Sequence, residues 1–234
     1  MKESPIILAI ETATAIGSVA VFSGENLLGS MTILREQSHA KLLTPMIQSL
    51  LAHLEIAPSD LDAIGVAKGP GSYTGLRVGV STAKGLCMAV DKPLLSTGSL
   101  DALAGQVTGL ATQLNAWICP MIDARRMEVY CALFNSQIEM LSPVEAKIIE
   151  SGAFSDILAT QKVIFVGDGA DKCREILSIS PNALILPDIL SNATGMGKSL
   201  YRQFMEGAFE DIITFEPFYL KEFRATKPKN LLGM

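Results

Sequence analysis

The order of the apolar segments in the first hundred residues is the feature that most restricts what this chain can fold into. Three strand-like runs come first, joined by short turns, and helix and strand patterns then alternate. The expected strands are Ile6–Ile10, Gly17–Phe22, Leu27–Leu34, Ala63–Ala67 and Leu94–Ser96, and the expected helices are Ser38–Leu54 and Thr74–Val90. A meander of three strands followed by this alternation predicts one sheet covered by helices.

The second half begins with a weak copy of the first. The segment Ile7–Phe22 aligns with Cys119–Phe134, so that Glu11 falls on Asp123. Such a repeat predicts a duplicated architecture, and the strand order matches the RNase H-like half of an actin-like (ASKHA) α/β fold. We therefore expect a complete N-terminal lobe, residues 1–105, and a reduced C-terminal lobe, residues 106–234, with the junction inside Gly98–Asn115. A likeness of fold alone assigns no function.

The chain is poor in charge. Charged residues make up 18% of it, against about 25% in a typical soluble domain, which predicts extensive burial, including burial against another subunit. The net charge of −5 argues against nucleic-acid binding by this chain alone, because phosphate contacts need clustered Lys and Arg. A basic cluster occurs only near the C-terminus, at Lys221, Arg224, Lys227 and Lys229.

Cysteine spacing and hydropathy favour the cytoplasm. Cys87, Cys119, Cys131 and Cys173 contain no CxxC pair, and we expect them to be buried, reduced thiols. The apolar run Ile6–Ile10 is shorter than the ~7–15 residues of a signal-peptide core. No uncharged apolar stretch reaches the ~18 residues of a membrane span. We therefore expect a cytoplasmic protein with no membrane contact.

The sequence offers no good candidates for metal-binding residues or for a catalytic nucleophile. The two histidines, His39 and His53, lie at opposite ends of one expected helix, about 21 Å apart at 1.5 Å per residue, so they cannot share an ion. Ser72 is not in a GxSxG elbow and has no nearby histidine to act as its base. We expect no catalytic residue and no metal site, His39 at the surface or an interface, and Ser72 with Thr74 capping a helix.

A nucleotide site is the alternative that stays open. The turn Gly69–Gly71 precedes a helix, which favours an anion, but it carries neither a Walker ending nor GxGxxG. The residues that could line a nucleotide cleft between the lobes are Glu11, Thr12, Asp123, Gly167 and Gly169. On this interpretation the chain is an actin-like ATPase or a small-molecule kinase. A peptidase is a weaker third hypothesis.

The two expected helices carry more apolar surface than one sheet needs. Apolar residues of Ser38–Leu54 spread over about 180°, whereas a helix with one buried face has a stripe nearer 100°. Pro45 should kink this helix or mark its start. On the second helix Gly75, Gly79 and Ala83 recur every fourth residue, which allows close helix contact. The pattern fits tight packing within one domain or a helical contact with another subunit.

Four segments carry a resemblance to a known family. "LAIETATAIGSVAVF", "SHAKLLTPMIQSLL", "LDAIGVAKGPGSYTGLRVGVSTAKGLCMAV" and "VGDGA" resemble the TsaB (YeaZ) family of bacterial proteins needed to make threonylcarbamoyladenosine in tRNA. The stretch "GPGSYTGLR" is quite specific for it. The similarity covers essentially the whole chain and is strongest over residues 6–105.

The resemblance implies a non-catalytic subunit. Such a subunit binds TsaD, the enzyme that transfers threonylcarbamoyl to N6 of the adenosine 3′ of the anticodon, and with it the ATPase TsaE. TsaD has a metal-binding HxxxH motif where this chain reads "TGSLDALA", without a histidine. The resemblance further implies homodimers through the same face, tRNA contact only within the complex, and no cofactor of its own, ATP or ADP binding being limited to the assembled interface. The residues expected at the partner contact are Leu42, Leu43, Met46, Ile47, Leu50, Leu51, Gly75, Leu76, Gly79, Val80 and Ala83.

Overall fold

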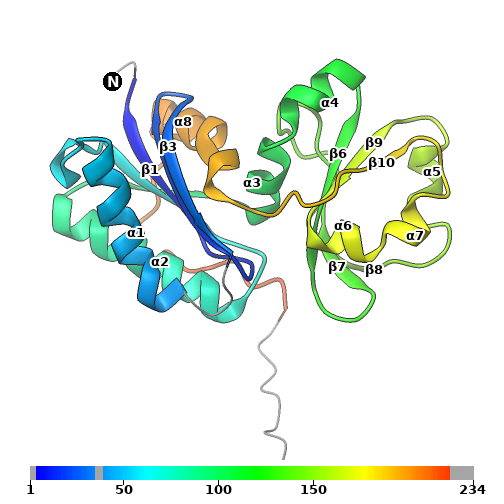
Figure 1. The fold of residues 1–234 in the computed structure, drawn as a ribbon, viewed down its shortest axis with the longest axis horizontal. Helices are drawn as coiled ribbons and strands as arrows, with labels where there is room; N and C mark the ends of the chain where they lie inside the picture. The colour runs from blue at the N-terminus through cyan, green and yellow to red at the C-terminus, as the bar shows by residue number, and fades with distance from the viewer. Residues whose placement is uncertain (1–3, 35–38, 222–234) are drawn as a thin grey trace, which may run out of the picture.

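A computed structural model of the chain describes residues 4–34 and 39–221, and it contains two sheets that lie side by side (Figure 1). The first sheet has the strand order β3-β2-β1-β4-β5. Its central pair, β1 and β4, is parallel, whereas β1, β2 and β3 form an antiparallel meander. The elements of this half are β1 (Ile6–Glu11), β2 (Gly17–Ser23), β3 (Asn26–Ile33), α1 (His39–His53), η1 (Pro58–Asp60), β4 (Ala63–Ala67), α2 (Tyr73–Val90) and β5 (Leu94–Thr97).

The second sheet repeats this order, as β10-β9-β6-β7-β8. Its central strand β6 pairs antiparallel with β7 and parallel with β9, as β1 does with β2 and β4. The duplicated α/β, actin-like fold expected from the sequence is therefore confirmed. The elements of this half are β6 (Trp117–Asp123), β7 (Glu128–Cys131), β8 (Glu145–Ile148), α5 (Ser155–Leu158), β9 (Val163–Val166), α6 (Asp168–Lys172), α7 (Arg174–Leu177) and β10 (Ala183–Ile185).

The helices that follow each sheet cross to the other one. After β5 come α3 (Ser99–Gly105) and α4 (Thr108–Leu114), and α3 contributes Leu100 and Leu103 to the core of the second half. After β10 come η2 (Ala193–Met196) and α8 (Gly197–Glu206), whose Leu200 packs against the first sheet. Both η2 and α8 lie within the expected second lobe, residues 106–234, but they pack against the first sheet.

Both faces of the first sheet are buried, which explains its continuous apolar strands. All five residues of β4 are buried. One face packs against α1 and α2 through residues such as Leu50 and Val80, and the other packs against η2 and α8. The bounds of α1 and α2 agree with the predicted helices to within one residue, and Ser72 caps α2 as predicted. Pro45 lies inside α1, on an exposed position, and does not begin it.

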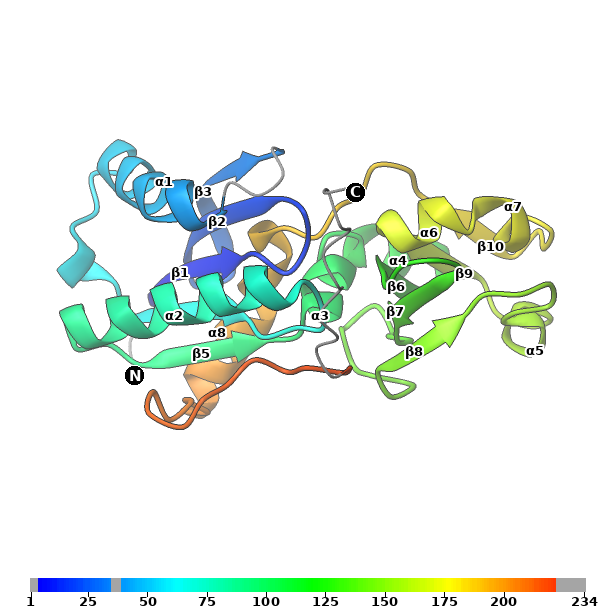
Figure 2. The same cartoon turned by 90° about the horizontal axis from the view of Figure 1, so that it is seen from below.

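A tail segment, residues 207–221, follows α8 and runs beneath β5 toward the second half (Figure 2). Glu210 bridges to Leu94 of β5, and Phe215 is buried in the first core. Three residues of the C-terminal basic cluster lie outside the described residues: Arg224, Lys227 and Lys229. The four cysteines are buried and free, as predicted. In the described part of the chain, no helix has both the length and the hydropathy that crossing a membrane would take.

Candidate functional site

The turn Gly69–Gly71 packs against other parts of the same chain. The Ser72 amide donates to the carbonyl oxygen of Ala13 at 2.6 Å, and the Phe218 amide donates to that of Lys68 at 2.7 Å. A side chain at Gly71 would collide with Ala13. The β1–β2 turn and the tail segment therefore both contact this loop, and its Gly69 and Pro70 also border a cavity.

The first turn of α2 is also engaged within the chain. The Ser72 hydroxyl oxygen accepts from the Gly75 amide at 3.3 Å, which satisfies one of the free N–H groups at the helix start. The centroids of the Tyr73 and Tyr219 rings are 4.9 Å apart. The Arg77 Cζ atom lies 4.2 Å from the centroid of the Tyr73 ring. Arg77 Nε donates to the Tyr219 hydroxyl at 3.2 Å. These contacts join the tail segment to α2.

Most of the residues predicted to contact a partner are buried in the core of this chain. Leu43, Met46, Ile47, Leu50 and Leu51 of α1 are each at most 5% exposed. The predicted positions on α2 are buried as well, and Leu42 is half-buried. The wide apolar stripe has a local cause, because α1 packs on both the sheet and α2. Burial within this chain leaves little of these side chains accessible to a partner, and their contact with a partner stays a prediction.

The glycines of α2 serve the same internal packing. A side chain at Gly75 would collide with the carbonyl oxygen of Thr12, and one at Gly79 with the Thr12 hydroxyl. That hydroxyl donates to the Gly75 carbonyl oxygen at 2.8 Å. The small residues thus let α2 approach the β1–β2 turn, which is the single-domain interpretation of the repeat. Thr12 is fully buried by this contact and does not face a ligand cleft.

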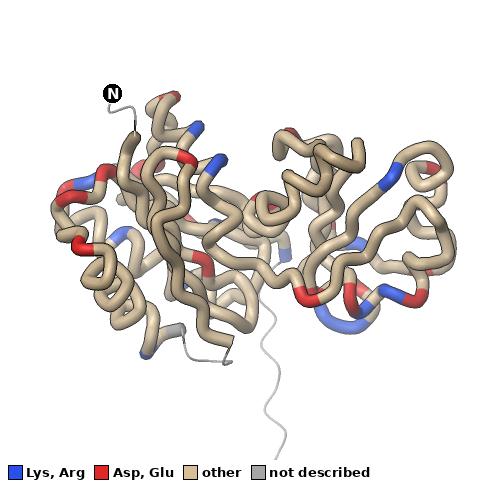
Figure 3. Tube along the Cα trace, turned by 45° about the horizontal axis from the view of Figure 1, so that its top comes forward, with Lys and Arg blue, Asp and Glu red and all other residues tan. Residues whose placement is uncertain are grey.

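The opposite surface of the two helices is exposed and poor in charge, Lys41 and Arg77 being the exposed charged residues of α1 and α2. It includes a patch of uncharged residues. We call this patch the outer face. Its Met88 is 74% exposed, and the space beside Gly85 is open. Figure 3 shows both helices largely free of charged residues. The outer face consists of Thr44, Pro45, Gln48 and Ala52 on α1 and Ser81, Gly85, Met88 and Ala89 on α2.

Sequence reasoning missed the outer face because apolar periodicity identifies the buried side of a helix. A signal was present nevertheless, since Ser81, Gly85 and Ala89 also recur every fourth residue. Ile213 of the tail segment, 88% exposed, lies beside this surface, because Lys84 of α2 donates to its carbonyl oxygen at 3.2 Å. The outer face therefore continues onto the tail segment.

Glu11, the first of the two expected cleft acids, is enclosed. It is fully buried at the end of β1, where its Oε1 accepts from the Ala13 amide at 2.5 Å and its Oε2 accepts from the Ser191 hydroxyl at 3.1 Å. Burial raises the pKa of the Glu11 carboxyl to about 7, although these hydrogen bonds oppose the shift. Glu11 thus fixes the β1–β2 turn to the segment that returns from the second half.

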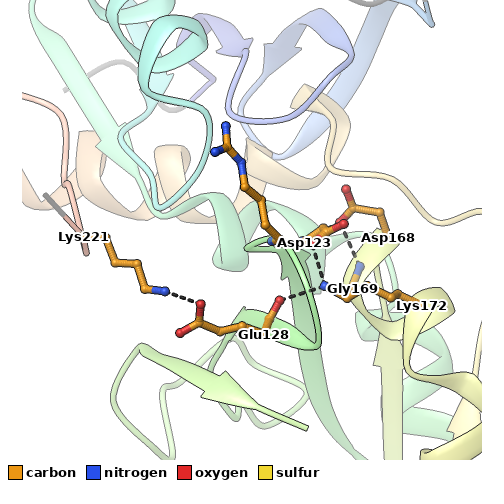
Figure 4. Close-up of polar contacts among 7 residues, drawn as sticks. Asp123, Glu128, Asp168, Gly169, Lys172 and Lys221 are labelled. Carbon is orange, nitrogen blue, oxygen red and sulfur yellow. Dashed lines mark hydrogen bonds and ion pairs between the residues drawn. The ribbon is translucent and has the colours of Figure 1, made fainter. Parts of the chain in front are cut away.

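Asp123, the second expected cleft acid, lies at the matching end of β6 but is exposed and paired (Figure 4). Its Oδ1 accepts from Lys172 Nζ at 2.5 Å, and its amide donates to Asp168 Oδ1 at 3.0 Å. Lys172 also donates to the Glu128 carbonyl oxygen at 2.8 Å, and Lys221 forms an ion pair with the Glu128 carboxylate. Burial raises the pKa of Asp168. The structure therefore gives the two aligned acids different surroundings.

The glycines of "VGDGA" have a packing role. Gly167 has φ 105°, and a side chain there would collide with the Met121 carbonyl oxygen. A Cβ at Gly169 would lie 2.9 Å from a Val129 methyl. The start of α6 therefore lies directly against β6 and β7. Among residues 4–34 and 39–221, no three His, Cys, Asp or Glu side chains are grouped to hold a metal ion.

Known proteins resemble this chain in sequence. The family model described as "TsaD: tRNA N6-adenosine threonylcarbamoyltransferase" matches residues 33–233. The tRNA threonylcarbamoyladenosine biosynthesis protein TsaB of Bacillus subtilis (strain 168) is 36% identical over 138 residues, 59% of this chain and 58% of that protein. TsaB of Escherichia coli (strain K12) is 33% identical over 129 residues, 54% of this chain and 53% of that protein. The matched region thus spans little more than half the length of these curated relatives.

Solved structures agree. A Pseudomonas aeruginosa protein described as similar to peptidase YEAZ has a TM-score of 0.81 at 26% identity, covering 93% of this chain and all of that one. A polyphosphate/ATP-glucomannokinase from Arthrobacter sp. strain KM has a TM-score of 0.53 at 12% identity, covering 86% and 99%, and shares the fold alone. The resemblance stated from the sequence is confirmed. Because the family model covers most of the chain, the chain belongs to the family described as TsaD: tRNA N6-adenosine threonylcarbamoyltransferase, and its likeness there is to the TsaB (YeaZ) proteins.

Proposed function

We propose that this chain is a non-catalytic subunit that binds TsaD and supports threonylcarbamoyl transfer to N6 of the adenosine 3′ of the anticodon in tRNA. The observation that carries the proposal is the outer face of α1 and α2, exposed and uncharged in a chain of this family. TsaB relatives are named for threonylcarbamoyladenosine biosynthesis. The proposal transfers that role to this chain and assigns the contact to the outer face.

The chemistry of the outer face suits a helical partner. A surface without charges loses little hydration when it is covered, because burying an unpaired charge is the costly step. Small residues such as Ser81, Gly85 and Ala89 let a partner helix approach closely, and the exposed Met88 supplies an adaptable apolar contact. Two helices side by side can provide the ~800 Å² per partner of an ordinary interface.

The surroundings of the expected cleft acids favour this role over an actin-like ATPase or kinase. Such an enzyme needs carboxylates that are free to bind a metal–nucleotide or to accept a proton. Glu11 is enclosed by the Ala13 amide and Ser191, and Asp123 is paired with Lys172. The Gly69–Gly71 turn is packed against the β1–β2 turn. No comparable observation favours a peptidase.

The remaining parts of the proposal concern the assembled complex. TsaE would join the pair, a second copy of this chain would use the same outer face in the absence of TsaD, and ATP or ADP would bind only at the assembled interface. The basic residues around Lys221 would contact tRNA within the complex. We place this assembly in the cytoplasm.

The test substitutes the outer face and leaves the core intact. Met88→Arg and Gly85→Arg should abolish copurification with TsaD and lower threonylcarbamoyladenosine formation on tRNA by at least about tenfold, because each buries a charge in the contact. Ile179→Arg is the matched control, since Ile179 is also 74% exposed but lies on the second half. Substitutions at Val80 or Leu50 would test folding instead, because both are buried.

Two outcomes would reject the proposal. Normal TsaD binding by both outer-face variants would exclude this surface. ATP hydrolysis by the isolated chain, if the Asp123→Ala substitution abolishes it, would favour the ATPase or kinase alternative. An absence of nucleotide binding by the isolated chain would oppose that alternative. Circular dichroism and thermal unfolding establish that each variant is folded before binding is measured.

A further inference from the structure

A cavity of about 420 Å³ lies between the two halves, at the carboxyl ends of β4 and β5. The residue after β4, the start of α3, the β7–β8 connection, α8 and the tail segment all contribute to its walls. Its volume is in the range of small-molecule sites. In α/β proteins, ligands bind in the crevice outside the carboxyl ends of parallel strands, and β1, β4 and β5 are parallel.

Two opposite charges line this cavity without forming an ion pair. Lys68 and Asp101 are both half-buried, and no ion pair within the described residues joins them. Burial raises the pKa of the Asp101 carboxyl, and the Lys68 ammonium lies close enough to oppose this shift. Half-buried charges without a direct partner are costly, and a bound ion of opposite sign removes that cost.

The Asp101 carboxylate is held in its position by the backbone around it. A side chain at Gly98 would collide with Asp101 Oδ2, so the glycine leaves room for the carboxylate beside the first turn of α3. A second cation, Arg202 of α8, also lines the cavity. It donates one hydrogen bond to the Gln137 carbonyl oxygen at 3.2 Å. A guanidinium has five N–H donors, so Arg202 can bind a carboxylate as well.

The rest of the lining is mixed: β5 and α8 contribute polar side chains, and two other segments contribute apolar ones. Ile138, Met140 and Val144 come from the second half, and Phe218 comes from the tail segment. Met140 is 50% exposed and Phe218 is 41% exposed, although both are large and apolar. An apolar ligand group would cover surface of this kind that now faces solvent.

We propose that this cavity binds a small zwitterion with an apolar side chain, an amino acid or a dipeptide. The ligand ammonium would lie at Asp101, its carboxylate at Lys68 and Arg202, and its side chain against Met140 and Phe218. The inference does not depend on the proposed binding of TsaD, because the cavity is formed by this chain alone.

The test titrates the full-length protein with L-leucine and L-leucyl-L-leucine, followed by amide chemical shifts of the cavity residues. The expected result is saturable shifts for one of the two ligands, which also decides between amino acid and dipeptide. L-Leucinamide, which lacks the carboxylate, and N-acetyl-L-leucine, which lacks the ammonium, should bind at least about tenfold more weakly than L-leucine if the amino acid binds. If the dipeptide binds, the amide and the N-acetyl form of the dipeptide are the corresponding analogues that each lack one charge.

Two variants assign each charge to its partner. Asp101→Asn should weaken binding of the zwitterion but not of its N-acetyl analogue, and Lys68→Met should weaken binding of the zwitterion but not of its amide. Glu150→Gln and Lys162→Met, exposed and away from the cavity, are the matched controls and should change neither. The absence of saturable shifts for both zwitterions with the wild-type chain would overturn the proposal. Equal binding of the zwitterion and both analogues would overturn it as well.

Discussion

In the first half, helices of 15 and 18 residues follow β3 and β4. In the second half the helices at the same places, α5, α6 and α7, have 4, 5 and 4 residues. The strand order is the same in both, so the sheet alone does not determine what each half presents. Long helices give the first half the outer face, whereas the second half packs its core against α3, α4 and short helices.

The acids at the ends of β1 and β6 also differ between the two halves, in how far they are exposed. Glu11 is covered by the chain that returns from the second half, and Asp123 remains 43% exposed beside Lys172. The segment that returns from the second half therefore covers the end of β1, whereas the equivalent end of β6 stays open.

The largest expected effect compares a buried leucine in each half. Leu50→Glu on α1 should lower the free energy of unfolding by about 4 kcal/mol or more, because it places an unpaired charge in the core. Leu177→Glu on α7 should cost about half as much, since a four-residue helix can detach locally and expose the new charge to water. Urea unfolding followed by circular dichroism measures both changes.

Met88→Glu serves as the control, because Met88 is 74% exposed and should change stability by less than about 0.5 kcal/mol. An equal loss for Leu50→Glu and Leu177→Glu would contradict the comparison, since it would show that the short helices are as firmly held as the long ones.

The next effect concerns pH and the two aligned acids. The folded-state pKa of Glu11 is about 7, above its ordinary 4.5, so the protonated form stabilises the fold. That contribution is complete below pH 4.5 and is lost as the pH rises through about 7. Glu11→Gln stays neutral, and its stability relative to wild type should therefore improve by about 3 kcal/mol between pH 4.5 and about pH 8.

Asp123→Asn is the matched variant in the second half. It removes a partly exposed ion pair with Lys172 and should cost less than about 1 kcal/mol near neutral pH. Urea unfolding at several pH values gives both results. A Glu11→Gln variant whose stability follows wild type at every pH would show that burial of the Glu11 carboxyl does not control this stability.

A smaller effect separates two glycines on the same helix. Gly75→Ala should destabilise the chain by about 2 kcal/mol, because the new methyl group collides with the Thr12 carbonyl oxygen. Gly85→Ala should instead stabilise it by up to about 1 kcal/mol, since alanine favours a helix and the space there is open. Thermal unfolding measures both. Stabilisation by both substitutions would mean that α2 can shift away from the β1–β2 turn.

The contrast between the two halves also explains how much of the fold could be predicted from the sequence. The strands and helices of the first half could be predicted because β4 is buried on both faces and α2 begins at a capping Ser72. The short helices of the second half span too few residues for a 3.6-residue period to show. β8 reads Glu-Ala-Lys-Ile, with no fully buried position, so its sequence has little strand pattern.

The candidate site was predicted in part. The helices α1 and α2 were identified, but the residues chosen on them are buried within the chain. Apolar periodicity marks burial whether the neighbour is the same chain or another. The alignment placed Glu11 and Asp123 at equivalent strand ends, which the sheet order confirms. It could not show that Glu11 is enclosed, because its partner Ser191 is 180 residues away along the chain.

The smallest effect concerns the contact that joins the halves through the tail segment. Lys221 pairs with Glu128 and lies 5.9 Å from the Tyr130 ring, while Phe218 in the same segment donates to the Lys68 carbonyl oxygen at 2.7 Å. Lys221→Ala should lower stability by less than about 1 kcal/mol, because Lys221 is partly exposed, yet hydrogen exchange at the Phe218 amide should become faster.

Lys147→Ala is the control, since it removes an ion pair of similar exposure that lies wholly within the second half, between Lys147 and Glu145. Its effect on exchange at the Phe218 amide should be absent. If both variants leave that amide unchanged, the tail segment is held by the first half alone through Phe215, Tyr219 and the Lys68 carbonyl. In that case the crossing helices, and not the tail segment, would be the elements that hold the two halves together.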